Sequence, residues 1–74
     1  MDKLLAILAD IRPDVDFTAE TKLVTEGILD SFDIVALVAD LNAAFNIAIG
    51  LTDLVPENFD SAEAMDSLIN RKLT

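Results

Sequence analysis

Ser31 is the residue whose type and position point most clearly to chemistry in this chain. It directly follows Asp30, a residue type that often caps the N-terminus of a helix, and it precedes apolar residues at helical spacing. Gly27 and the apolar pair Ile28-Leu29 stand just before, so we expect the hydroxyl to lie at a fixed corner of the chain. An Asp-Ser pair at a helix start is by itself an ordinary cap. Phe32, a large apolar residue expected to be exposed in the first turn, favours instead a hydroxyl presented to a partner.

The chain lacks the residues that would turn a serine hydroxyl into a catalytic nucleophile. A hydrolase serine needs a neighbouring base, and this sequence has no His, no Cys and only five Lys and Arg residues. The commonest proton shuttle is therefore missing, as are a thiol nucleophile and a thiolate metal site. Asp14 and Asp16 lack the Gly and Glu of a calcium loop, so we expect no metal there. A serine that another enzyme modifies needs only exposure, and we expect that the chain is not an enzyme.

The charge of the chain is strongly and unevenly acidic. Fourteen acidic and five basic residues give a net charge of −9, which argues against nucleic acid as a partner, because its binders neutralise phosphates with Lys and Arg. No basic residue lies between Lys22 and Arg71. This stretch can serve solubility alone, or it can form a docking face for a basic partner. Its acidic residues are Glu26, Asp30, Asp33, Asp40, Asp53, Glu57, Asp60, Glu63 and Asp66.

A first helix and a long connection lead to Ser31. Apolar residues repeat at helical spacing over about residues 2–11, and Pro13 follows where a helix often stops. Residues 12–30 have no sustained period and form a connection of unusual length for a compact domain. We expect Phe17, Leu23 and Leu29 to hold this connection against the helices.

The helix that begins at Ser31 has the strongest pattern. It is predicted over about residues 31–45, with Asp33 in its first turn, where a negative charge suits the helix dipole. A short helix is predicted within residues 51–59, and a last helix over about 61–72, where Asp60 with Glu63 resembles a capping box. No alternating pattern is long enough for a strand. The sequence therefore predicts one all-α domain, residues 1–74, built as a small four-helix bundle of three main helices and one short helix.

The stretch around Ser31 resembles the attachment motif of a known family. Residues 27–35, Gly-Ile-Leu-Asp-Ser-Phe-Asp-Ile-Val, look like the motif of acyl and peptidyl carrier proteins, in which an Asp-Ser-Leu or close variant opens the second helix of a four-helix bundle. The resemblance covers nearly the whole chain in length, acidity, helix order and the long first loop. Residues 56–61 are also similar to stand-alone carriers and to the D-alanyl carrier group, which also tends to place Phe after the serine.

The resemblance implies a function for the matched residues. Ser31 would receive 4′-phosphopantetheine from a separate phosphopantetheinyl transferase that uses coenzyme A, and the arm would carry an acyl or aminoacyl group as a thioester. An adenylating acyl or aminoacyl ligase would load it, and acyl-transferring enzymes would accept the cargo. Asp30, Phe32 and Asp33 match positions that the family presents to partner enzymes, and Asp40 lies further along the same helix face.

A second class of function stays open from the residues alone. A small acidic helical module could bind a basic protein partner with Ser31 unmodified. No apolar run approaches the ~18 residues that cross a membrane, and the segment that follows Met1 lacks the basic start and cleavage site of a signal peptide. We therefore expect a cytoplasmic monomer that does not insert into membranes.

Overall fold

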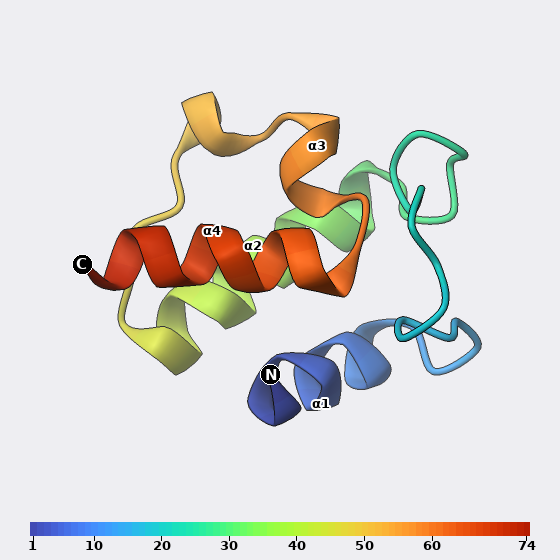
Figure 1. Cartoon of the computed structure of the whole chain (residues 1–74), viewed down its shortest axis with the longest axis horizontal. Coiled ribbons are helices and arrows are strands. Elements are labelled where there is room, and N and C mark those ends of the chain that lie inside the picture. Colours follow the sequence, from blue (N-terminus) through green and yellow to red (C-terminus); the bar gives the residue numbers. More distant parts are fainter.

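The computed structural model describes residues 1–74, and all of its regular elements are helices (Figure 1), which confirms the predicted all-α class. None of its helices combines the length and the apolar character that a membrane span needs. In chain order the elements are α1 (Asp2–Ile11), α2 (Ser31–Phe45), the 3-10 turn η1 (Leu51–Asp53), α3 (Pro56–Phe59) and α4 (Ala62–Leu73).

Helices α1 and α2 run antiparallel and are tied at both ends. Leu8 of α1 and Leu41 of α2 are buried in the shared core, at the helical spacing that the sequence shows. Near the beginning of α1, the Lys3 ammonium donates a 2.6 Å hydrogen bond to the carbonyl of Ala44 and lies 5.0 Å from the ring centroid of Phe45. The end of α1 therefore lies at the start of α2, where Ser31 is found.

Residues at the helix ends explain where α2 stops and where α3 starts. Asn46 takes a left-handed backbone conformation with φ of 55°, a conformation that Asn tolerates better than most residues, and its N–H bonds the carbonyl of Asn42. The Asn42 side chain then accepts from the N–H of Ile49 at 2.8 Å. Pro56 occupies the first turn of α3, where its missing N–H costs no hydrogen bond.

The N-terminus of α4 differs from the prediction. The capping box of Asp60 with Glu63 is wrong, because Ser61 is the cap and its Oγ accepts from the N–H of Ala64 at 3.0 Å. The Asp60 carboxylate accepts instead from the N–H groups of Val24 and Thr25, at 2.9 and 2.8 Å, and from the Thr25 hydroxyl at 2.6 Å. The carboxylate thus accepts three hydrogen bonds from the long loop, whereas at the cap position of α4 it would accept only one or two.

The loop over residues 12–30 is packed, as the sequence predicts. Phe17, Leu23 and Leu29 are buried in the core, and Leu23 is fully enclosed. The N–H of Leu23 bonds the carbonyl of Asp60, and the N–H of Leu29 bonds the carbonyl of Leu23, both at 2.9 Å. In Figure 1 the loop runs along one end of the molecule, from the end of α1 to the start of α2. This packing holds the segment that leads into Ser31.

Candidate functional site

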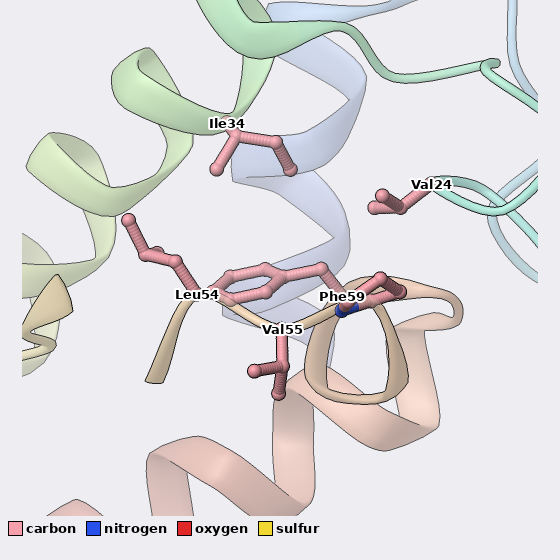
Figure 2. A pocket seen from close by; sticks show the side chains of 6 residues that line it. Val24, Ile34, Leu54, Val55 and Phe59 are labelled. Atoms are coloured by element: carbon pink, nitrogen blue, oxygen red, sulfur yellow. The ribbon is translucent and has the colours of Figure 1, made fainter. Parts of the chain in front are cut away.

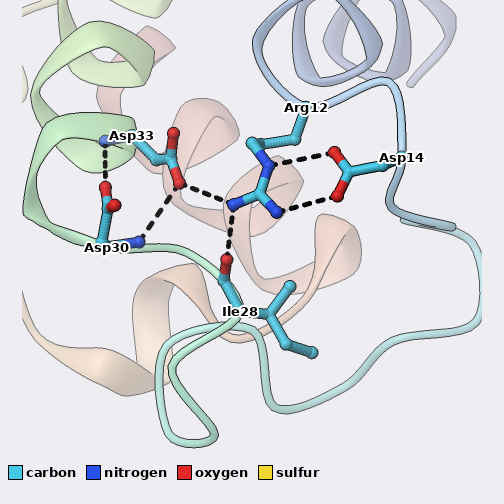
Figure 3. Close-up of polar contacts among 5 residues, drawn as sticks. All are labelled: Arg12, Asp14, Ile28, Asp30 and Asp33. Atoms are coloured by element: carbon cyan, nitrogen blue, oxygen red, sulfur yellow. Dashed lines mark hydrogen bonds and ion pairs between the residues drawn. The ribbon is translucent and has the colours of Figure 1, made fainter.

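Ser31 is the first residue of α2, and its side chain is exposed. Its neighbours Asp30 and Asp33 form a reciprocal capping box (Figure 3). Asp30 Oδ1 accepts from the N–H of Asp33 at 2.9 Å, and Asp33 Oδ2 accepts from the N–H of Asp30 at 3.2 Å. The Ser31 hydroxyl itself forms no hydrogen bond within the chain. The backbone on both sides of the serine is therefore fixed while its oxygen stays free.

The start of α2 also keeps backbone donors available. The capping box uses the N–H of Asp33, and the N–H of Ile34 bonds the carbonyl of Asp30 at 3.1 Å. The N–H groups of Ser31 and Phe32 have no partner in the chain, as is usual in the first turn of a helix. These donors and the helix dipole favour an anionic group bound to the serine oxygen.

Gly27 makes the turn that brings the chain back toward Ser31. Its φ of 73° lies in the left-handed region, which residues with a side chain adopt only with strain. Its N–H bonds the carbonyl of Val24 at 3.0 Å, which closes the turn. The glycine of the sequence motif thus has a backbone role, and the turn allows Leu29 to reach the core.

An open apolar groove begins beside Ser31. A hollow of about 420 Å³ lies next to the serine, and it shares Val24, Ile34 and Leu54 with a second hollow of about 170 Å³ that reaches Phe59. Figure 2 shows Val24 from the loop and Ile34 from α2 pointing toward the Phe59 ring. The two hollows together form one groove between α2, the long loop and the segment before α3, lined by Val24, Leu29, Asp30, Ser31, Ile34, Val35, Leu54, Val55, Pro56 and Phe59.

Three of the four residues predicted to face partners are exposed. Asp30 and Asp40 are exposed on α2, and Phe32 has 86% of its surface accessible. The sequence did not single out Val35 and Leu54, two further exposed apolar residues that line the groove. The sequence shows only that these two residues are apolar, and this does not distinguish an exposed groove residue from a core residue.

Asp33 is turned inward and differs from the other three. Its side chain is only 16% exposed, and its carboxylate accepts from Arg12 at 3.0 Å as well as from the N–H of Asp30. Its carboxylate therefore acts within the molecule, as a cap and as an ion-pair partner. Arg12 was not among the predicted site residues, because it stands 21 positions before Asp33 and belongs to no local motif.

Comparison with known protein families shows which family the chain belongs to. Residues 2–65 match the protein family described as the phosphopantetheine attachment site. The chain belongs to this family of carrier proteins. It is also similar to aminoacyl carrier protein 1 of Bradyrhizobium diazoefficiens, with 36% identity over 58 residues. The match covers 78% of this chain and 63% of that protein. No solved structure gives a significant match.

Membership of the carrier family implies a prosthetic group and a non-catalytic role for this domain. The prosthetic group of the family is 4′-phosphopantetheine, and the domain carries it without catalysing a reaction itself. The start of α2 fits such a group, because it offers a free hydroxyl and the two unpartnered N–H groups of Ser31 and Phe32. The N-terminus of α2 is therefore suited to hold a phosphodiester.

Proposed function

We propose that Ser31 is the residue that carries 4′-phosphopantetheine, and that the protein delivers an acyl or aminoacyl group to partner enzymes. One observation supports Ser31 over the other two serines: it alone combines exposure, a helix N-terminus and a hydroxyl with no hydrogen bond. The Ser61 hydroxyl is occupied as the cap of α4. Ser67 lies inside α4, away from any free backbone N–H.

The chain supplies position, and the modifying enzyme supplies the chemistry. Attachment forms a bond between Ser31 Oγ and a phosphorus of coenzyme A, while the diphosphate bond breaks and the nucleotide leaves. The serine proton passes to a base of the transferase, because no basic side chain of this protein contacts the hydroxyl. When attached, the prosthetic group supplies a terminal thiol on a flexible arm, on which the cargo is held as a thioester.

The exposed residues of α2 support a docking role. We propose that Asp30, Phe32 and Asp40 contact the phosphopantetheinyl transferase, an adenylating ligase and the downstream acyl-transferring enzymes in the cytoplasm. Phe32 offers an apolar anchor beside the serine, and the acidic surface steers basic partners by charge. The aminoacyl carrier protein among its relatives makes an aminoacyl cargo the first to test.

Mass spectrometry of the intact protein tests the proposed attachment residue. Wild type incubated with a broad-specificity phosphopantetheinyl transferase and coenzyme A is expected to gain one phosphopantetheine, and Ser31→Ala is expected to gain none. Ser67→Ala is the matched control, because it removes an exposed hydroxyl elsewhere and should be modified like wild type. A gain that persists in Ser31→Ala would place the attachment at another residue.

The same measurement addresses the other class of function. If wild type gains no mass with active transferase and coenzyme A, the protein acts instead as an acidic helical module that only binds a partner. A second carrier protein, modified in the same mixture, establishes that the transferase is active.

A further inference from the structure

Arg12 joins the end of α1 to both sides of the Ser31 segment. It is the cap residue directly after α1, and 30% of its side chain is exposed. In Figure 3 its guanidinium lies between two carboxylates. Nε and Nη2 donate to the two oxygens of Asp14 at 3.0 and 2.9 Å, and Nη1 donates to the Ile28 carbonyl at 2.8 Å and to Asp33 Oδ2 at 3.0 Å.

These contacts lie on either side of the proposed attachment residue. Ile28 is three residues before Ser31, and Asp33 is two residues after it. Arg12 is the only hydrogen-bond donor to the Ile28 carbonyl, and the Asp33 oxygen that it binds also accepts from the N–H of Asp30. One guanidinium therefore constrains both the loop that enters α2 and the capping box that starts it.

Arg12 is also the only cation that pairs with the acidic residues at this corner. No other Lys or Arg forms an ion pair with Asp14, Asp30 or Asp33. Hydrogen bonds from Arg12 lower the pKa of Asp14, so this carboxylate stays charged next to the guanidinium. Without Arg12, three carboxylates would repel one another beside the serine.

We propose that Arg12 is a positioning residue, which holds Ser31 in the geometry that its modification requires by binding Ile28 and Asp33. This inference rests on the proposed function of Ser31. The planar fork of an arginine is needed, because the bonds of Nε and Nη2 to Asp14 orient Nη1, which donates to both Ile28 and Asp33. A lysine ammonium keeps the charge but cannot also make the two bonds to Asp14 that orient it.

Kinetics of modification separate positioning from stability. Arg12→Gln is expected to lower kcat by about tenfold or more with the carrier as the varied substrate, because a displaced hydroxyl is poorly oriented in the bound complex. Partial unfolding would instead reduce the concentration of competent carrier, which raises the apparent KM and leaves kcat unchanged. Arg71→Gln is the matched control: it makes the same change in net charge, and the only side-chain hydrogen bond of Arg71 is to Asn58, far from Ser31 in the sequence. A kcat for Arg12→Gln equal to that of Arg71→Gln would overturn the proposal.

Arg12→Lys shows whether the fork or the charge matters. Its kcat is expected to lie between those of wild type and Arg12→Gln, since one of the bridging contacts can be kept. A wild-type kcat in Arg12→Lys would refute positioning by the fork, because the positive charge would then suffice.

Amide exchange measured by NMR on the unmodified protein tests the positioning without any transferase. The N–H groups of Asp30 and Asp33 are expected to exchange faster in Arg12→Gln than in Arg71→Gln, while those in the middle of α2 and α4 remain protected. Unchanged exchange at Asp30 and Asp33 would overturn the role of Arg12 even if Ser31 is modified. A wild type that gains no phosphopantetheine would refute the proposed function alone, and this exchange result would still decide whether Arg12 holds the segment.

Discussion

Replacing Leu23 by alanine tests how the long loop is held. Leu23 is 0% exposed, and its backbone N–H and carbonyl both form hydrogen bonds that the substitution leaves in place. The loss is therefore one of packing, and we expect about 3 kcal/mol, within the range for a buried leucine replaced by alanine. A chain of 74 residues has a total unfolding free energy of about 4–11 kcal/mol. This substitution should thus remove a large part of it and lower Tm by roughly 12–24 °C.

Urea unfolding followed by circular dichroism measures the loss directly. Leu51→Ala is the matched control, because it removes the same atoms from a residue that is 88% exposed, and its effect should stay within about 0.5 kcal/mol. The urea midpoint should therefore fall for Leu23→Ala and remain near wild type for Leu51→Ala, with similar m-values. Equal stability of the two variants would refute the reasoning, since it would mean that the loop does not contribute Leu23 to the core.

Two further predictions concern acid stability and docking. Hydrogen bonds donated by the Thr25 hydroxyl and by the N–H groups of Thr25 and Val24 lower the pKa of Asp60 in the folded state. The unfolded chain then takes up the proton first, so this stabilisation is complete above the ordinary pKa of 3.8 and is lost as pH falls through the lower folded value. Tm should drop between pH 5 and pH 2, and less steeply in Asp60→Asn; identical slopes would contradict the role of Asp60. Phe32→Ala should lower kcat/KM for modification by several-fold and leave Tm unchanged, because the side chain is exposed; a lower Tm would instead make Phe32 structural.

The helices were predictable because their signals are local. The spacing of apolar residues placed the first helix over 2–11, and Asp30 marked the start of the second; the structure has α1 at Asp2–Ile11 and α2 at Ser31–Phe45. The start of α4 was less clear, because Asp60 and Ser61 are adjacent residues of capping type. The contacts of Asp60 with Val24 and Thr25, 36 and 35 residues earlier in the chain, leave Ser61 as the cap.

The site was predictable only in part. The motif predicts Ser31 and an exposed Phe32, because helix caps and the first turn of a helix depend on neighbouring residues. The motif also predicted that Asp33 faces partners, since an acidic residue in the first turn can serve a partner surface as well as a cap. Arg12 carries no motif, and its contact with Asp33 exists only after α1 and α2 pack antiparallel. The groove likewise depends on Leu54 and Phe59 meeting Val24 and Ile34 across the fold.

The sequence by itself determined the helical class, the order of the helices, the carrier resemblance and the absence of His and Cys. Each of these follows from composition or from patterns within a few residues. Tertiary structure decided which acidic residues face outward and which act within the molecule: Asp60 holds the long loop, Asp33 binds Arg12, and Asp40 remains exposed. The physical reason is that a carboxylate has the same charge wherever it stands, and only folding brings it to a donor or leaves it in water.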